Sequence, residues 1–184
     1  MPELPEKELV LVLGGARSGK SSWALRYTEK RYHSPLFLAT AEVLDDEMEQ
    51  RVTLHKASRG PGWKLVEEPL DIANVLEKSR GDVDAVLIDC LTIWLSNVLL
   101  KMGEDAVVSQ QDRLISALSR RKQAVIVVAN EVGMGIVPEH ALGRQFRDFA
   151  GVLNQKTAAI ADRVVLLTAG LPMFLKGNGP SSAL

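Results

Sequence analysis

The chain has 184 residues, a formal net charge of -1 and 46% hydrophobic residues. This length fits one domain, expected over residues 8–176 with flexible ends at 1–7 and 177–184, and buries roughly 70% of the unfolded surface. The near-zero charge provides no basic field for nucleic acid or an acidic membrane, so we expect neither as a partner.

A single cysteine, Cys90, excludes an internal disulfide and a cysteine-rich metal site. No stretch is apolar over a length that could span a bilayer, and the start M-P-E-L-P-E-K-E is acidic, unlike a signal peptide. These features predict a cytoplasmic protein without membrane insertion.

Apolar runs alternate with segments of helical spacing, which predicts an α/β fold with a mostly parallel sheet flanked by helices. Strands are expected at residues 8–13, 36–39, 63–67, 85–88, 124–128 and 163–168. Helices are expected at residues 20–30, 70–78, 90–100, 107–118 and 142–161, and another should begin near the acids of residues 45–49. Residues 171–175 follow a two-residue turn and should form an antiparallel hairpin at the sheet edge.

The first strand leads into G-G-A-R-S-G-K-S at residues 14–21, which matches the phosphate-binding loop pattern G-x-x-x-x-G-K-S/T. A glycine turn with a solvated lysine is the alternative, but the strand before it and the helix after it favour the phosphate loop. Its backbone N–H groups would surround an anion, Lys20 would reach the outer phosphates, and the Ser21 hydroxyl would bind Mg²⁺. A nucleoside triphosphate is the expected ligand.

Asp89 ends an apolar run, as the acid of a Walker B site does. A strand-terminal cap would explain the same pattern. Together with the phosphate loop, Asp89 is predicted to bind magnesium with Ser21.

Two further segments leave predicted strands at their carboxyl ends, where open α/β sheets bind ligands. Thr40, Ala41 and Glu42 follow one strand, and N-E-V-G-M-G-I-V-P at residues 130–138 follows another. The second is either an ordered loop at the ligand edge or an ordinary connector.

His33 and His140 are expected at the surface, whereas His55 lies in R-V-T-L-H-K and allows two interpretations. A lone histidine is usually structural or exposed. Imidazole can also attack phosphorus and form a phosphoramidate, and Lys56 and Arg59 would suit the charge of that intermediate.

Aromatic residues at helical spacing are expected in the core. Trp23 is therefore predicted to pack rather than stack on a base. The predicted core stripe of the last helix comprises Phe146, Phe149, Ala150 and Leu153.

The ordered set of motifs resembles the adenosylcobinamide kinase/adenosylcobinamide-phosphate guanylyltransferase family from residue 9 to about residue 175. Besides the phosphate loop, the matching segments are L-A-T-A-E, L-D-D-E-M, R-V-T-L-H-K, R-G-P-G-W, I-D-C-L-T, N-E-V-G-M-G-I-V-P and F-R-D-F-A-G-V-L-N-Q.

The resemblance implies a P-loop fold of the RecA type and a bifunctional enzyme that forms trimers. ATP or GTP would phosphorylate adenosylcobinamide, a corrinoid, and GTP would then guanylylate the product through a GMP-histidine intermediate. His55 and Lys20 would be catalytic, and Ser21 and Asp89 would bind Mg²⁺. The nucleotide-binding residues would be Gly14, Gly15, Ala16, Arg17, Ser18, Gly19, Lys20, Ser21, Thr40, Ala41, Glu42, Lys56, Ala57, Ser58, Arg59, Glu67 and Asp89.

Two other functions remain open from the sequence. The chain could be a P-loop kinase without the guanylyltransferase step, or a GTP-binding module without catalysis. A covalent GMP adduct would distinguish the bifunctional enzyme from both.

Overall fold

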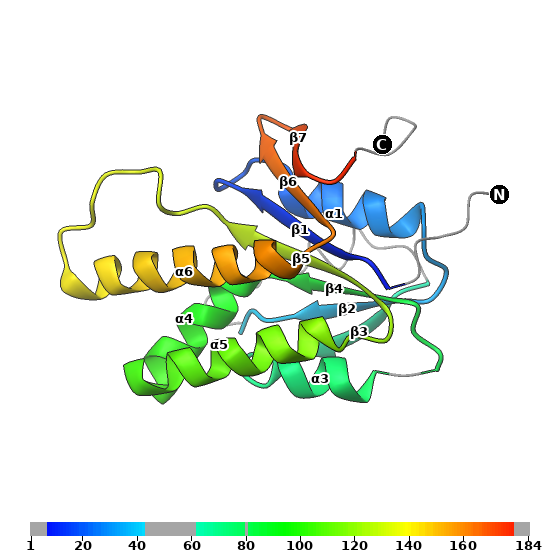
Figure 1. Ribbon diagram of the computed structural model, residues 1–184, viewed down its shortest axis with the longest axis horizontal. Helices are drawn as coiled ribbons and strands as arrows, with labels where there is room; N and C mark the ends of the chain where they lie inside the picture. Colours follow the sequence, from blue (N-terminus) through cyan, green and yellow to red (C-terminus); the bar gives the residue numbers. More distant parts are fainter. Residues whose placement is uncertain (1–6, 43–61, 80, 179–184) are drawn as a thin grey trace.

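The computed structural model describes residues 7–42, 62–79 and 81–178. Seven strands form one sheet in the order β3-β2-β4-β5-β1-β6-β7 (Figure 1). The strands are β1 (Leu9–Gly14), β2 (Pro35–Ala39), β3 (Lys64–Glu67), β4 (Ala85–Asp89), β5 (Ala124–Asn130), β6 (Arg163–Thr168) and β7 (Leu171–Lys176). The helices are α1 (Lys20–Glu29), α3 (Ile72–Lys78), α4 (Leu91–Met102), α5 (Glu104–Ser119) and α6 (Ala141–Ile160).

The first six strands pair in parallel, and only β6 and β7 pair antiparallel. The predicted parallel sheet and the predicted antiparallel edge hairpin are both confirmed. The turn between β6 and β7 consists of Ala169 and Gly170, which adopt φ values of 52° and 82°. Such left-handed pairs favour two-residue hairpins because their twist matches that of the strands.

Helices cover both faces of the sheet: α1 lies on one face, and α3, α4, α5 and α6 lie on the other (Figure 1). The central strand β1 shows why its sequence is apolar throughout. Leu9 and Leu11 pack with the four-helix layer, whereas Val10 and Val12 pack against α1. A parallel strand buried on both faces cannot alternate with polar residues.

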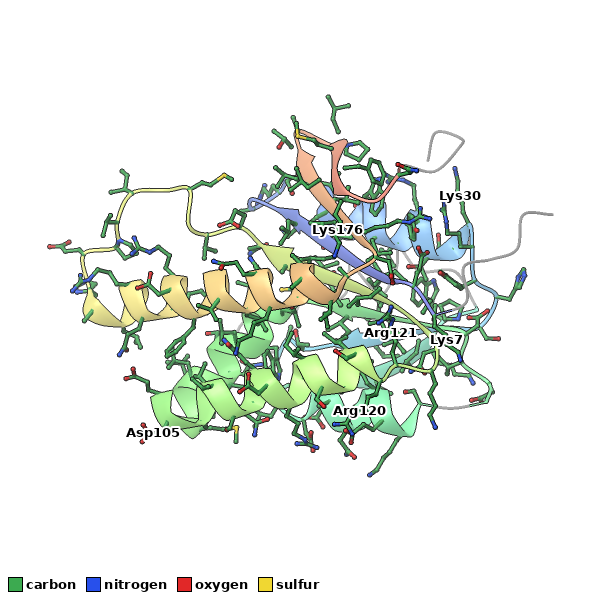
Figure 2. The ribbon with its side chains drawn as sticks, viewed as in Figure 1. Lys7, Lys30, Asp105, Arg120, Arg121 and Lys176 are labelled. Carbon is green, nitrogen blue, oxygen red and sulfur yellow. The ribbon has the colours of Figure 1, made fainter. Side chains whose placement is uncertain are left out.

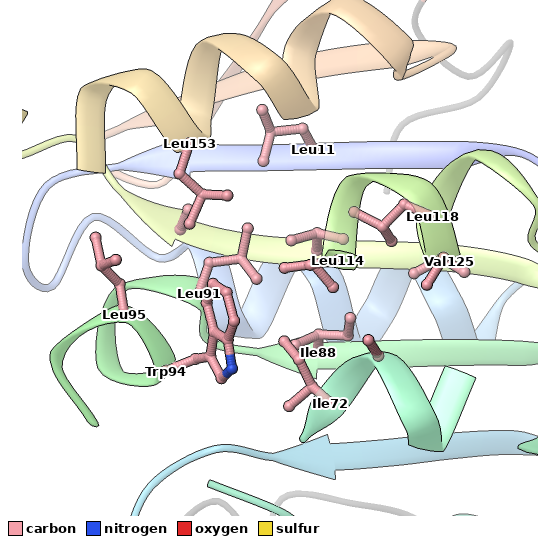
Figure 3. Packing of buried hydrophobic residues seen from close by; sticks show 14 of the residues in the cluster. Leu11, Ile72, Ile88, Leu91, Trp94, Leu95, Leu114, Leu118, Val125 and Leu153 are labelled. Carbon is pink, nitrogen blue, oxygen red and sulfur yellow. The ribbon is translucent and has the colours of Figure 1, made fainter. Parts of the chain in front are cut away.

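The larger core lies between the sheet and the four-helix layer (Figure 3). Leu91, Trp94 and Leu95 of α4 reach toward the sheet, and Leu114 and Leu118 of α5 pack beside them. Each fully buried side chain of this size contributes about 1.5–3 kcal/mol of transfer free energy. This layer fixes α4 beside the carboxyl ends of the strands.

The predicted helix boundaries are wrong by a few residues around Gly103. Helix α4 extends to Met102 and α5 already begins at Glu104, earlier than the expected residue 107. Gly103 has a φ of 83°, which allows the sharp change of direction between the two helices. Glu104 and Asp105 then lie in the first turn of α5, where carboxylates favour the helix dipole.

The predicted packing of Trp23 is confirmed, because the side chain is 2% exposed and stacks on Tyr27 with the ring centroids 4.9 Å apart. The stripe on α6 divides: Ala150 and Leu153 are buried, while Phe146 and Phe149 pack against the core half-buried. His33 and His140 are exposed, as predicted.

No helix of the described chain is long and apolar enough to cross a membrane. The predicted helix near residues 45–49, His55 and the four residues 56–59 lie outside the described residues, as do most of the two predicted flexible ends.

Candidate nucleotide site

The carboxyl ends of the six parallel strands lie at one edge of the sheet. Strand register aligns Ala39 of β2 with Asp89 of β4 on one side and with Glu67 of β3 on the other. Gly14 of β1 aligns with Asn130 of β5. The structure therefore brings together the strand ends that carry the predicted phosphate, metal and nucleotide residues.

Gly14, at the end of β1, has no space for a side chain. A Cβ at this position would lie 2.4 Å from Ser18 Oγ and 2.7 Å from the Leu167 carbonyl oxygen. The Gly14 carbonyl accepts from the Glu131 amide at 3.1 Å, which joins the start of the phosphate loop to the exit of β5.

The phosphate loop turns through two left-handed residues, Arg17 with a φ of 56° and Gly19 with a φ of 91°. The β6–β7 turn supports it from the side, because the Gly170 amide donates to the Ser18 carbonyl at 3.0 Å. A Cβ on Gly19 would lie 3.3 Å from Gly170 Cα, so the loop and the hairpin turn approach closely. Gly15, Ala16 and Arg17 are exposed on the other side.

Lys20 begins α1, and its ammonium closes the loop by donating to the Gly15 carbonyl at 2.9 Å. The residue is only 9% exposed. Burial lowers the pKa of Lys20, and the Cys90 thiol and the Asp89 carboxylate act in the opposite direction. A poorly solvated cation beside a ring of backbone amides is suited to bind an anion.

Two buried oxygen atoms at this edge have no hydrogen-bond partner within the part of the chain that the structure describes. They are Ser18 Oγ in the loop and Asn130 Oδ1 at the end of β5. Other groups of Asn130 are paired: its amide donates to Thr92 Oγ1 at 2.7 Å, and its carbonyl accepts from Asn154 Nδ2 at 3.2 Å. Buried polar atoms are costly unless paired, which favours a polar ligand at this edge.

The predicted magnesium ligands fit this edge. Ser21 lies half-buried in the first turn of α1, and Asp89 ends β4 close enough to influence the pKa of Lys20. A hydroxyl and a carboxylate are the hard oxygen donors that Mg²⁺ prefers, with water and phosphate oxygens as the other ligands. Among the described residues no cluster of three or more acidic, histidine or cysteine side chains forms a metal site by itself.

Thr40 is fully buried, and its polar groups join the ends of β2 and β4. Its hydroxyl donates to the Cys90 carbonyl and accepts from the Cys90 amide, both at 2.8 Å, and its amide donates to the Asp89 carbonyl at 3.3 Å. The described bonds give Thr40 a role in holding the strand ends; its predicted contact with a nucleotide stays a prediction.

Ala41 and Glu42 continue from Thr40 at the same edge, and both are half-buried. The Glu42 carboxylate forms an ion pair with Lys101 of α4. Glu67 is exposed at the end of β3.

Residues 131–140 connect β5 to α6 and project beyond the sheet (Figure 1). The Glu131 carboxylate accepts from the Gly133 amide at 2.8 Å, and Arg144 donates to the carbonyls of Pro138 at 3.0 Å and Glu139 at 2.6 Å. These bonds hold the two ends of the loop, and they leave open whether it contacts a ligand or only connects β5 to α6. Met134 and Ile136 at its tip are 82% and 98% exposed.

The cationic side chains Lys7 and Arg121 lie at the amino ends of the strands, away from the phosphate loop (Figure 2). Arg121 donates to the Lys7 carbonyl at 2.5 Å and pairs with Asp162 at 2.6 Å. These bonds give Arg121 a structural role at the far end of the sheet. Lys20 and Arg17 are the cations that the structure places in the phosphate loop.

The family profile described as cobinamide kinase / cobinamide phosphate guanyltransferase matches residues 10–175. The chain belongs to this family. The match begins in β1 and ends in β7, so it includes the phosphate loop and every other strand end of the site.

Curated relatives span almost the same length as this member of the family. A bifunctional adenosylcobalamin biosynthesis protein, CobP of Pseudomonas aeruginosa, is 40% identical over 168 residues, covering 91% of this chain and 97% of the relative. The proteins named CobU from Salmonella typhimurium and Escherichia coli are 38% and 36% identical over 184 residues, covering 91% of this chain and 99% of each relative.

Solved structures with low sequence identity share the fold. A Pyrococcus horikoshii OT3 protein superposes with a TM-score of 0.56 at 10% identity, covering 94% of this chain and 87% of that chain. The RadB recombinase superposes with a TM-score of 0.53 at 14% identity, covering 88% and 74%. The predicted P-loop fold of the RecA type is confirmed.

The structure thus collects residues 14–21, 40–42, 67 and 89 at one edge, while His55 and residues 56–59 lie outside the described parts. Three residues at this edge were not predicted to contact the ligand: Asn130, which begins the segment expected at the ligand edge, Asn97 and Lys101. Asn130 could have been found, because it directly follows the most β-branched run of the chain. The other two lie inside a helix that is otherwise mostly apolar, where no motif marks them.

Proposed function

We propose that this protein is a bifunctional enzyme of cobalamin nucleotide-loop assembly, which phosphorylates adenosylcobinamide and then transfers GMP from GTP to the product. The family match over residues 10–175 carries the proposal. It is supported by relatives named as bifunctional adenosylcobalamin biosynthesis proteins at 36–40% identity. The phosphate loop, with its buried Lys20, is the geometric support.

In the first reaction, the corrinoid hydroxyl attacks the γ-phosphorus of ATP or GTP. The bond between that phosphorus and the bridging oxygen breaks, and the nucleoside diphosphate leaves. The loop amides and Lys20 hold the phosphates in line and stabilise the developing charge. Ser21 and Asp89 would hold Mg²⁺, which neutralises phosphate charge when bound.

In the second reaction, a nitrogen of neutral His55 attacks the α-phosphorus of GTP, and pyrophosphate leaves toward Lys20. A phosphate oxygen of adenosylcobinamide phosphate then attacks the same phosphorus. The P–N bond breaks, His55 is released, and adenosylcobinamide-GDP forms. Lys56 and Arg59 would balance the charge of the intermediate, and residues 40–42, 57, 58 and 67 would contact the nucleotide.

The two reactions share one triphosphate site and differ in which phosphorus is attacked. The corrinoid and the nucleotides are the small-molecule partners. We further propose a trimer, as the resemblance of the motifs implies, that works in the cytoplasm, as the single cysteine and the acidic start indicate.

Product analysis tests the proposal directly. Incubation with adenosylcobinamide, GTP and Mg²⁺ should yield the phosphate first and the GDP derivative second. His55→Ala should retain the first product and lose the second. Formation of the phosphate alone by the wild-type protein would identify a kinase without the transferase step, and GTP binding without either product would identify a binding module.

A further inference from the structure

One face of α4 contacts the segments that leave β2 and β3. Trp94, Asn97 and Lys101 are spaced i, i+3 and i+7, which places them on the same side of the helix. Their contacts are Trp94 Nε1 to the Leu70 carbonyl at 2.7 Å, Asn97 Nδ2 to the carbonyls of Thr40 at 2.9 Å and Pro69 at 3.1 Å, and the ion pair of Lys101 with Glu42.

Asn97 is the central member of this set. Its side chain is buried, and one amide nitrogen donates to two carbonyls on different segments. An amide nitrogen carries two hydrogens, so both donors are used. Because Thr40 follows β2 and Pro69 follows β3, this side chain ties the two strand exits together. It does so one residue beyond the backbone bond from the Glu68 amide to the Ala39 carbonyl at 2.9 Å.

Lys101 adds a weaker contact one turn further along α4. Its side chain is 44% exposed and that of Glu42 is 26% exposed, so solvent screens their ion pair. The pair nevertheless sets the direction of the Glu42 carboxylate at the exit of β2.

We propose that Asn97, with Lys101 beside it, is a positioning residue for the nucleoside part of GTP. It holds the exits of β2 and β3 at the spacing that lets residues 40–42 and Glu67 contact one nucleoside. This inference rests on the proposed function, where those residues are nucleotide contacts. Asn97 itself touches neither substrate nor phosphate.

The phosphates are supported by different parts of the chain. The Gly170 amide holds the Ser18 carbonyl at 3.0 Å, and Lys20 holds the Gly15 carbonyl at 2.9 Å. Neither bond involves α4. Loss of the α4 contacts should therefore weaken binding of the nucleoside and leave binding of the polyphosphate unchanged.

The test compares dissociation constants for Mg²⁺-GTP and for Mg²⁺-tripolyphosphate, which lacks the nucleoside. Asn97→Asp keeps the side-chain shape but removes both donors and turns a carboxylate toward two carbonyl oxygens. GTP affinity should fall about tenfold, the equivalent of about 1.4 kcal/mol, with tripolyphosphate affinity unchanged.

Gln111→Glu is the matched control. Gln111 is a buried amide on α5 that donates to the Phe149 carbonyl of α6 at 3.1 Å, so its bond involves neither β2 nor β3. The same amide-to-carboxylate change there should leave the ratio of the two affinities at the wild-type value. A fall of that ratio in Gln111→Glu equal to the fall in Asn97→Asp would overturn the inference.

A second pair of variants decides the matter if Asn97→Asp does not fold. Lys101→Gln should weaken GTP about twofold to threefold and spare tripolyphosphate. Lys156→Gln breaks a similarly exposed ion pair with Asp112 and should change neither affinity.

If the variants of Asn97 and Lys101 keep the wild-type ratio of GTP affinity to tripolyphosphate affinity, the positioning role is wrong. The proposed function would stand in that case, because the wild-type protein would still prefer GTP to tripolyphosphate. Equal wild-type affinity for the two ligands contradicts the nucleoside contacts of the proposed function, and the positioning role with them.

Discussion

Both ends of the parallel sheet contain buried polar side chains, but these side chains have different partners at the two ends. At the amino end, Glu8 is buried, and its Oε1 accepts from the hydroxyls of Tyr27 at 2.7 Å and Tyr32 at 2.8 Å. Its Oε2 has no hydrogen-bond partner within the described chain, but it forms an ion pair with Arg163, whose Nε lies 3.2 Å away. Burial, followed by the Glu8 carboxylate, raises the pKa of both tyrosines, so both stay protonated donors.

At the carboxyl end, the polar groups are left ready for a ligand. Lys20 is buried against a backbone carbonyl, and Ser18 Oγ and Asn130 Oδ1 are buried without a hydrogen-bond partner among the described residues. The amino end contributes stability, whereas the carboxyl end gives up stability to bind anions. Substitutions at the two ends of the sheet should separate these two roles.

The largest effect is expected at Lys20. Lys20→Met should lower both transfer reactions at least about 100-fold, because each needs the polyphosphate held. The melting temperature of the ligand-free protein should not fall, since a buried charge is replaced by an apolar chain of similar length. Activity assays and thermal unfolding check both statements, and a retained kinase step would contradict the shared phosphate site.

Glu8→Ala should show the opposite pattern. The variant removes the acceptor for two buried tyrosine hydroxyls and the charge that faces Arg163. The free energy of unfolding should therefore fall by about 3 kcal/mol. The melting temperature should fall by about 6–12 °C while GTP affinity stays unchanged below the transition.

Asp148→Ala is the control for Glu8, because its carboxylate is 69% exposed and pairs only locally with Arg147 within the described chain. Its stability should change by less than about 0.5 kcal/mol. Equal losses in Glu8→Ala and Asp148→Ala would remove the basis for a stabilising amino end.

A smaller effect is expected where the phosphate loop meets the hairpin turn. Gly19→Ala forces a side chain into a φ of 91° and places its Cβ 3.3 Å from Gly170 Cα. Gly103→Ala also forces a side chain into a positive φ, of 83°, with open space around it. Its ψ of 169° lies in a region that essentially only glycine adopts, so its backbone penalty is at least as large as that of Gly19→Ala. Gly19→Ala should lose about 1–2 kcal/mol of unfolding free energy and Gly103→Ala at least as much. Only Gly19→Ala should lower tripolyphosphate affinity, which calorimetric titration measures.

The smallest effect concerns the titration of Lys20. Its pKa is lowered in the folded protein, whereas the unfolded chain keeps the ordinary value of 10.5. Between these values the unfolded state holds the proton that the folded state has lost, so stability rises with pH there. The gain in unfolding free energy of Lys20→Met over the wild-type protein should therefore be largest at neutral pH. It should decrease as the pH rises through the lowered pKa of Lys20. A pH-independent difference in unfolding free energy would argue against the buried charge.

Much of this architecture was predictable because it depends on short-range patterns. The apolar run of β1 predicted a buried parallel strand, and G-x-x-x-x-G-K-S predicted the phosphate loop. Helix boundaries were wrong near Gly103, where a single glycine lets α5 start directly after α4.

Contacts between distant segments could not be predicted. Glu8 was placed in the first strand, but nothing in its neighbourhood indicates two tyrosine donors and Arg163. The bond from Gly170 to Ser18 joins residues far apart in the chain. Asn97 and Lys101 likewise acquire their roles only when α4 packs beside the strand exits. His55 shows the converse: a motif predicts its chemistry, although it lies outside the described residues.

We propose that one phosphate site serves attack at two phosphorus atoms, with His55 as the carrier of GMP. Intact-protein mass spectrometry after exposure to GTP and Mg²⁺ tests it most directly. We expect the mass of the wild-type protein to increase by one GMP. The increase should be lost on acid treatment and absent in His55→Ala. Absence of the adduct from the wild-type protein, or its persistence in His55→Ala, would contradict the role of His55 as the carrier of GMP.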